Sequence, residues 1–163
     1  MLEILYPRRC AVCDEIEVTG KGICPLCKDK VHVAGEPACK KCGKPLVDER
    51  KEFCTDCGKK HHVYTQGKAV FVYEGGIRNS MYRFKYGNKR EYAEFYANAA
   101  LEKYGVWLNK IKAEVLIPIP MYSRKKRLRG YNQAEVFARE LGRKAGILVD
   151  EHLVRRVRNT IPQ

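Results

Sequence analysis

Two adjoining stretches near the middle of the chain carry apolar residues at helical spacing. A helix is predicted over residues 77–86, where Ile77, Met81 and Phe84 share one face, and the sequence Gly-Asn-Lys that follows breaks it. A second, longer helix is predicted over residues 90–104. Its buried side is expected to consist of Tyr92, Phe95, Tyr96, Ala99 and Ala100.

A third helical pattern lies nearer the C-terminus and has a signal at each end. Asn132 is a suitable N-cap, and Glu135 follows three residues later, as in a capping box. Gly146 is placed to end the helix. The apolar face between them is formed by Ala134, Phe137, Ala138, Leu141 and Ala145.

Three further stretches have the composition of β-strands. Residues 68–75 are rich in β-branched and aromatic residues and end at two glycines. The apolar run at 114–120 has the pattern of a central parallel strand buried on both faces. Residues 147–149 could begin another strand after the third helix. Strand, basic loop, helix and strand form a βαβ unit, so we expect an α/β domain with a parallel sheet.

The positive charge of the chain is concentrated in its second part. The 163 residues carry a formal net charge of +13. Residues 1–60 hold 12 Lys and Arg against 10 Asp and Glu, whereas residues 61–163 hold 20 against 9. This excess favours phosphorylated or nucleic-acid ligands for the second part. No apolar run reaches the roughly 18 residues of a membrane span, and no signal-peptide layout is present, so a cytoplasmic location is expected.

All eight cysteines lie in the first part, in four Cys-x-x-Cys pairs. Two such pairs complete a tetrahedral thiolate shell, so we predict two structural zinc ions. Pairing in sequence order is preferred over a crossed arrangement, and Gly43 and Gly58 follow their pairs where a knuckle turn favours positive φ. His61 and His62 could replace a ligand, but we interpret them as linker residues. The predicted ligands are Cys10, Cys13, Cys24 and Cys27 for one ion, and Cys39, Cys42, Cys54 and Cys57 for the other.

Other uses of these cysteines fit less well. A reducing compartment disfavours disulfides, and four redox-active pairs in one small module would be unusual. An iron–sulfur cluster remains an alternative with the same ligands. Each half of the module has about thirty residues and few large apolar side chains, so metal binding would supply folding energy that a small core lacks. We predict a double zinc ribbon over residues 1–62 and a second domain over residues 63–163.

The loop between the predicted strand at 114–120 and the third helix is strongly cationic. Five of the six residues at 124–129 are Lys or Arg. In parallel sheets ligands bind beyond the carboxyl ends of the strands, and this loop also leads into a helix N-terminus. Because arginine matches phosphate oxygens with two parallel hydrogen bonds, the loop indicates a phosphate or pyrophosphate ligand.

With these features in place, the chain resembles the ComF family of competence proteins, which join a double zinc ribbon to a phosphoribosyltransferase-type domain. The resemblance rests on the four cysteine pairs, on "MYRFKYGNKREYA", on "IPIPMYSRKKRLRGYNQ" and on the closing "RRVRNTIPQ". The third stretch is similar to the family's strand followed by Arg-Gly-Phe-Asn-Gln, with Tyr131 in place of phenylalanine. The last stretch is similar to the family's Arg-x-Arg-x-Thr-x-x-Gln segment.

The resemblance implies a type I phosphoribosyltransferase fold that binds phosphoribosyl pyrophosphate with magnesium. It also implies a role in natural transformation, with single-stranded DNA as ligand and a competence helicase as partner. Carried over by position, the residues that bind pyrophosphate or shape its loop would be Arg124, Lys125, Arg127, Arg129, Gly130, Asn132 and Gln133.

The sequence departs from the family pattern at one essential place. The family's loop of two adjacent acidic residues and a Thr-Thr-Gly turn is absent from the 163 residues. Asp150 and Glu151 follow apolar residues, but Leu153 and Val154 stand where the turn would be, so we do not assign this segment to that loop. We therefore expect a C-terminally truncated, partial phosphoribosyltransferase-like domain in which catalysis is lost.

Two other functions are compatible with the same residues. A non-catalytic accessory module could bind single-stranded DNA through Arg83, Lys85, Lys89 and Arg90, with bases stacked on neighbouring aromatic rings. The rings in question are Tyr82, Phe84, Tyr86, Tyr92, Tyr96 and Tyr122, about two-thirds of which we assign to the core because of their helical spacing. Alternatively, the zinc module docks a protein partner and the remainder is scaffold.

Overall fold

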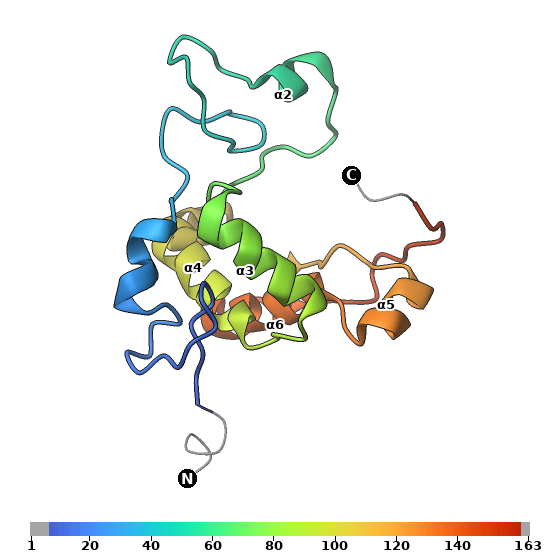
Figure 1. The fold of residues 1–163 in the computed structure, drawn as a ribbon. Helices are drawn as coiled ribbons and strands as arrows, with labels where there is room; N and C mark the ends of the chain where they lie inside the picture. The colour runs from blue at the N-terminus through green and yellow to red at the C-terminus, as the bar shows by residue number, and fades with distance from the viewer. Residues whose placement is uncertain (1–6, 161–163) are drawn as a thin grey trace.

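The computed structural model describes residues 7–160 and shows an N-terminal region with all eight cysteines, which we call the ribbon region, followed by a mainly helical body (Figure 1). The ribbon region contains the short helices η1 (Pro25–Lys30) and α2 (Thr55–Lys59). The body contains α3 (Gly75–Tyr86), α4 (Tyr92–Ile111), α5 (Ser123–Arg129) and α6 (Gln133–Ala145). Two short strands, β1 (Val115–Leu116) and β2 (Leu148–Val149), complete it.

The three longer helices confirm the periodic patterns in the sequence. α3 begins two residues earlier than predicted, at Gly75, and α4 continues seven residues beyond the predicted end. α6 begins after Asn132, whose side chain accepts a hydrogen bond from the Ala134 amide, and ends at Gly146 in the left-handed conformation. Glu135 accepts from the side chain of Asn132 rather than from its backbone amide, so the capping box is incomplete.

α4 and α6 pack against each other and form the centre of the body. Ala97 and Ala100 of α4 lie against Leu141 of α6, because small residues allow the two helices to approach closely. A second cluster joins α3 and α4 through Phe84, Tyr96 and their neighbours. Of the six aromatic rings considered for base stacking, Phe84, Tyr92 and Tyr96 are buried, which is half of them rather than the predicted two-thirds.

The parallel sheet is much smaller than the sequence suggested. β1 and β2 pair in parallel, with Val115 opposite Leu148 and Leu116 opposite Val149, so the predicted βαβ connection is present. Of the apolar run at 114–120, only two residues are in a strand, and Ile119 is 76% exposed. The prediction of a central strand buried on both faces was therefore wrong. Val115 and Ile117 are also 38% and 41% exposed, and Pro118 and Pro120 lack the amides that pairing needs.

The stretch at 68–75 is also not a strand. It forms a single antiparallel bridge, between Phe71 and Val33. The amide of Val72 donates to the carbonyl of His32, and the amide of Ala34 donates to that of Val70. Gly75 and Gly76, which we expected to end a strand, instead begin α3, and this limits the pairing to a few residues. The predicted basic loop is likewise partly helical, because Ser123–Arg129 form α5.

The first half of the ribbon region belongs to the same core as the helices. Ala11 is 1% exposed and packs in the cluster that contains Ile77, Phe84 and Tyr92. Gly76 allows α3 to approach η1 closely, since a Cβ there would lie 2.8 Å from the Lys30 carbonyl oxygen and 2.7 Å from the Val12 side chain. The core therefore includes residues on both sides of the predicted domain boundary.

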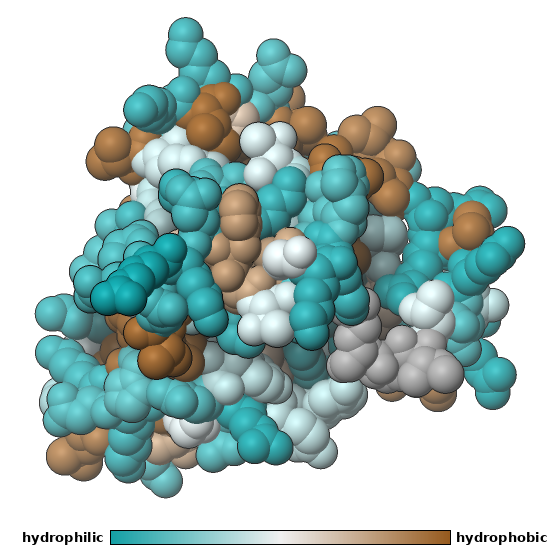
Figure 2. Space-filling model, turned by 90° about the horizontal axis from the view of Figure 1, so that it is seen from above, coloured by the Kyte–Doolittle hydropathy of each residue, from teal (hydrophilic) through white to brown (hydrophobic). Residues whose placement is uncertain are grey.

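The second half of the ribbon region, residues 35–69, is an excursion of the chain away from this core. It leaves and returns through the paired segments 32–34 and 70–72, and Figure 1 shows its loops and α2 standing apart from the helices. Lys103 and Tyr104 of α4 fasten the return point, because both side chains donate to the carbonyl of Ala69 at 3.0 and 2.8 Å. The face seen in Figure 2 is mostly hydrophilic, with hydrophobic residues in separate patches. Among the described helices, none is both long enough and apolar enough to cross a membrane.

A matched pair of glycine substitutions tests the packing of α6 on the sheet. A Cβ at Gly142 would lie 2.6 Å from Val149 Cγ2 and 2.7 Å from the Ile147 carbonyl oxygen. We expect Gly142→Ala to lower the free energy of unfolding by about 1–3 kcal/mol, because the crowded atoms include backbone. Gly105 lies inside α4 with open space around it, so Gly105→Ala should raise stability by about 0.5–1 kcal/mol. Urea unfolding followed by circular dichroism measures both, and equal effects would contradict the packing described here.

Candidate metal centres and basic cleft

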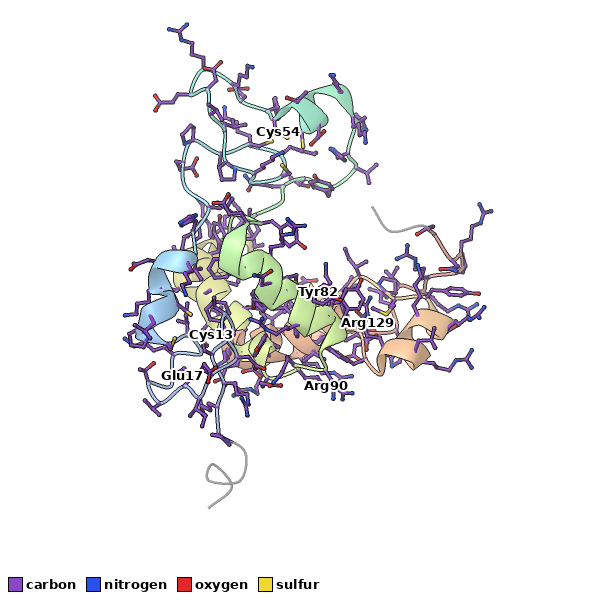
Figure 3. The ribbon with its side chains drawn as sticks, viewed as in Figure 1. Cys13, Glu17, Cys54, Tyr82, Arg90 and Arg129 are labelled. Atoms are coloured by element: carbon purple, nitrogen blue, oxygen red, sulfur yellow. The ribbon has the colours of Figure 1, made fainter. Side chains whose placement is uncertain are left out.

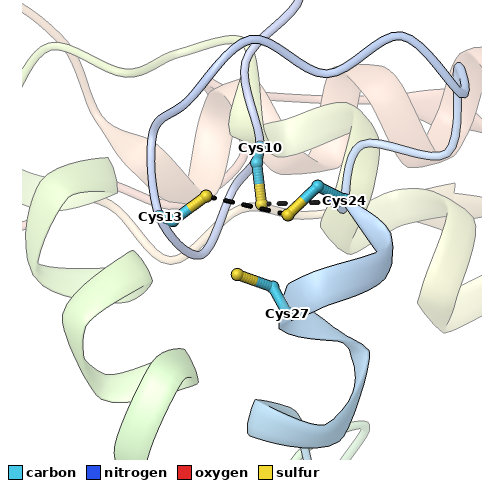
Figure 4. Close-up of side chains that lie close together, drawn as sticks. All are labelled: Cys10, Cys13, Cys24 and Cys27. Carbon is cyan, nitrogen blue, oxygen red and sulfur yellow. Dashed lines mark hydrogen bonds between the residues drawn. The ribbon is translucent and has the colours of Figure 1, made fainter.

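The first four cysteines form one compact cluster. The Sγ atoms of Cys10, Cys13, Cys24 and Cys27 all lie within 4.8 Å of one another, and Figure 4 shows the four side chains pointing toward a common centre. The Sγ atoms of Cys13 and Cys24 are 3.8 Å apart. A tetrahedral zinc ion with Zn–S bonds of about 2.3 Å would separate its sulfur ligands by roughly 3.8 Å. The cluster therefore fits a zinc ion, and none of its thiols is in a disulfide.

The remaining four cysteines repeat this arrangement. Cys39, Cys42, Cys54 and Cys57 meet the same 4.8 Å limit, and Cys42 Sγ lies 3.8 Å from Cys54 Sγ. An antiparallel bridge flanks the first Cys-x-x-Cys pair of each cluster at the same position. The bridge Arg9–Ile16 flanks the first pair of the first cluster, and Ala38–Pro45 flanks that of the second. Pairing in sequence order is thus confirmed, and the two four-cysteine clusters are consistent with two structural zinc ions. His61 and His62 are in neither cluster, and the ring of His62 stacks on Tyr64 instead.

Each cluster combines a knuckle turn with the start of a short helix. In the two knuckles, the amide of the residue after the second cysteine donates to the carbonyl of the first cysteine. Gly43 has φ of 75° there, as predicted, but the corresponding residue in the first knuckle is Asp14, with φ of 69°. Gly58 lies in α2 and does not have positive φ, so its predicted role was wrong. The second pairs, at 24–27 and 54–57, instead lead into η1 and α2.

The thiols of each cluster differ in how readily they ionise. Burial works against ionisation of Cys39, but hydrogen bonds from backbone amides, chiefly that of Cys54, lower its pKa to about 6. Burial and backbone hydrogen bonds oppose each other in the same way at Cys10, whose pKa is lowered to about 7. Burial raises the pKa of Cys27 and of Cys57 to about 12, and the neighbouring thiols add to the effect. Because each thiolate opposes ionisation of the next, a divalent cation is needed for four thiolates to coexist.

The first knuckle is attached to the helical body by polar contacts. The Asp14 carboxylate accepts a hydrogen bond from Tyr92 Oη at 2.6 Å and pairs with Lys89 Nζ at 2.8 Å. Burial opposes ionisation of Asp14, but its bonds to Lys89 and Tyr92 hold its pKa below the usual range. Arg83 donates to the carbonyl of Val12. The residues between Cys10 and Asp14 are therefore held both by the metal shell and by α3 and α4.

A separate cleft of about 1100 Å³ lies between the C-terminal end of α3, α5, and the segment after β2. Lys85, Lys125, Arg129 and Arg156 line it, and its other lining residues include no carboxylate. Figure 3 shows Arg129 beside the C-terminal end of α3, and its guanidinium lies 4.6 Å from the centre of the Tyr86 ring. The remaining lining residues are Tyr86, Ile119, Met121, Leu128, Gln133 and Thr160.

The structure separates the residues predicted to surround pyrophosphate. Lys125, Arg129 and Gln133 line the cleft, and Arg129 Nη1 donates to Gln133 Oε1 at 2.7 Å. Arg124 and Arg127 are exposed on α5 and are not among the lining residues.

Gly130 and Asn132, the other two residues predicted around pyrophosphate, instead determine the path of the backbone. Gly130 has φ of 83° and ends α5. Asn132 is buried and donates to the Ile119 carbonyl at 3.0 Å while it caps α6. It therefore holds the segment after β1 against the start of α6.

The residues predicted to contact DNA also lie in different surroundings. Lys85 lines the cleft and is a member of no ion pair between described residues. Arg83 faces the first knuckle, and its Nε is buried without a hydrogen-bond partner in the described part of the chain. Lys89 pairs with Asp14, and Arg90 lies 4.8 Å from the centre of the Tyr131 ring. Of this set, only Lys85 faces the cleft.

Two polar lining residues were absent from the predicted sites. Arg156 and Thr160 belong to the segment after β2, and the Thr160 carbonyl accepts from Lys125 Nζ at 2.9 Å. The sequence did contain a signal that this segment contributes to the site. Parallel strands bring their carboxyl ends to one edge of the sheet, and the basic run 155–158 follows β2. Gln163, which ends the segment that resembles the family motif, lies outside the described residues.

Comparison with known protein families supports the ribbon region. Residues 1–58 match the family model of the double zinc ribbon domain, and this span contains both cysteine clusters. The chain thus has an N-terminal double zinc ribbon domain, followed by a mainly helical region with a two-stranded parallel sheet. Comparison with curated proteins gives no match, and neither does comparison with solved structures.

Cysteine substitutions in the two clusters should have unequal consequences. We expect Cys24→Ser and Cys54→Ser each to reduce the zinc content from two ions per chain to one. Cys24→Ser should also lower the melting temperature of the helical body, because Ala11 and Asp14 contribute to its core and contacts. Cys54→Ser should leave that transition nearly unchanged, since the second cluster lies in the excursion. Metal analysis and thermal circular dichroism at 222 nm measure both effects, and a similar loss of helix stability in both variants would contradict this difference.

Proposed function

We propose that this chain binds a phosphorylated ligand in the basic cleft. The observation that carries the proposal is the convergence of four cations, Lys85, Lys125, Arg129 and Arg156, on a cleft whose described lining has no acidic residue. They come from three separate parts of the chain, α3, α5 and the segment after β2. A solvated surface patch does not need such an arrangement, whereas a polyanionic ligand does.

The lining chemistry favours phosphate over a simple carboxylate ligand. Two arginines supply planar donor forks and two lysines supply compact charges, a combination that suits several phosphate oxygens at once. Gln133, in the first turn of α6, adds an uncharged polar side chain to the lining. Ile119, Met121 and Leu128 provide apolar surface for the rest of the ligand.

In its more specific form, the proposal is that the chain is a ComF-like, phosphoribosyltransferase-type protein of natural competence and DNA uptake. Phosphoribosyl pyrophosphate would be the ligand, and a competence helicase would be a partner. Support comes from the double zinc ribbon match and from the parallel connection between β1 and β2 that carries α5. The sequence lacks the acidic Thr-Thr-Gly loop of that family, so we propose binding without turnover for this chain.

Two arginines of α5 provide a direct test. Arg129→Ala should weaken binding of phosphoribosyl pyrophosphate by roughly 10- to 100-fold, because it removes charge-assisted hydrogen bonds inside the cleft. Arg127→Ala removes the same charge from the same helix but outside the cleft, so it should change affinity by less than about threefold. Isothermal titration calorimetry of the zinc-loaded chain measures both. Equal losses in the two variants would indicate attraction by overall charge and would contradict a defined site.

A second function is favoured by an exposed pair of aromatic rings. Tyr82 and Tyr86 on α3 are 64% and 61% exposed, and their ring centres are 5.0 Å apart. Exposed rings beside a basic cleft suit the stacking of bases in single-stranded DNA. We propose this binding as the alternative, with the DNA backbone following the cations of the cleft.

The alternative predicts a specific effect of one tyrosine. Tyr82→Ser should weaken binding of an oligothymidylate by about 1–3 kcal/mol, the usual contribution of one stacked base. Tyr73→Ser is the matched control, because Tyr73 is 62% exposed but lies before α3 and is not one of the two neighbouring rings. Fluorescence anisotropy at two salt concentrations measures affinity and the number of phosphate contacts. Binding that is equally strong in Tyr82→Ser and the unchanged chain would eliminate the stacking role.

A further inference from the structure

The donor groups of the basic cleft do not suit a magnesium ion. Mg²⁺ in proteins is held by carboxylate oxygens together with water and substrate phosphates. The lining residues offer the Gln133 amide oxygen and the Thr160 hydroxyl, but no carboxylate. Magnesium, which the family resemblance implies, therefore does not match the residues that the structure places here.

Three carboxylates that are close in sequence to the lining residues are engaged elsewhere. Asp150 Oδ1 accepts hydrogen bonds from the amides of His152 and Leu153 at 2.8 and 2.9 Å. Glu151 pairs with Arg139, whose Nη2 lies 2.6 Å from Glu151 Oε2. Glu135, at the start of α6, pairs with Lys126 at 2.6 Å. Each of these side chains would have to break a local contact to reach a metal ion in the cleft.

Several cations of the body outside the cleft are paired with carboxylates. Lys126, Arg139 and Lys144 each pair with a glutamate. By contrast, no carboxylate of residues 7–160 forms an ion pair with any of the four cleft cations. Lys125 and Arg156 donate instead to uncharged oxygens of Thr160. The four positive charges are thus uncompensated and face the same space.

We propose that the cleft binds diphosphate groups as free anions, with its four cations performing the charge neutralisation that Mg²⁺ performs in other sites. Mg²⁺ would then compete with the protein, because a magnesium-bound diphosphate carries less negative charge for the same four cations. The inference rests on the proposed function and specifies the form in which the ligand binds. It applies to inorganic pyrophosphate and to diphosphate esters alike, since both present the same oxygens.

The test is a calorimetric titration of the zinc-loaded chain with inorganic pyrophosphate. One arm uses buffer freed of divalent cations by a resin, without soluble chelator, so that the zinc ions remain bound. The other arm contains excess Mg²⁺ at matched ionic strength. We expect Mg²⁺ to weaken binding by roughly 3- to 30-fold, because removing charge from the ligand weakens charge-assisted hydrogen bonds.

Two arginines after β2 supply the matched control. In buffer without Mg²⁺, Arg156→Ala should weaken pyrophosphate binding by at least about tenfold, whereas Arg155→Ala should leave it within about threefold. Circular dichroism and zinc content establish that both variants are folded. Tighter binding with Mg²⁺, or binding that requires it, would overturn the metal-free inference and leave the phosphate cleft in place. If pyrophosphate bound in neither buffer, both the metal-free inference and the proposed phosphate-binding function would be overturned.

Discussion

The coordination of one metal ion by Cys10, Cys13, Cys24 and Cys27 is the constraint on which the rest of the structure depends. The knuckle that it fixes is also a part of the main core, since Ala11 packs among the aromatic residues of α3 and α4. Asp14 lies immediately after the second ligand and binds Lys89 and Tyr92. The metal shell and the helical body therefore stabilise each other.

The second cluster has a different relation to the body. It repeats the bridges and hydrogen bonds of the first, but its segment leaves the core and returns through a few paired residues. Its surface is thus available for contacts with other molecules. α3 contacts both the first metal site and the basic cleft. Its Arg83 donates to the first knuckle, while its Lys85 and Tyr86 line the cleft.

Anion binding depends on how cations are distributed as well as on how many there are. α5 and its neighbours hold many Lys and Arg residues, and several of them pair with carboxylates of α6 or of the segment after β2. The four in the cleft do not, so their charge is available to a ligand. The cleft is defined by the absence of compensating carboxylates in its described lining, a property that net charge alone does not express.

Local signals in the sequence determined the metal ligands and both ends of α6. Cys-x-x-Cys spacing places two thiols on one ion within a single turn, and the Asn132 cap and Gly146 specify α6 through their own backbone preferences. Interactions between distant segments were decided only by the tertiary structure. The apolar run at 114–120 has strand composition, but strand pairing needs a partner, and only two residues find one in β2. Likewise, the sequence identified a basic segment, whereas folding decided that Lys85 and Arg156 join Arg129 while Arg124 and Arg127 face solvent. Such groupings depend on long-range packing, which the local pattern of residues does not specify.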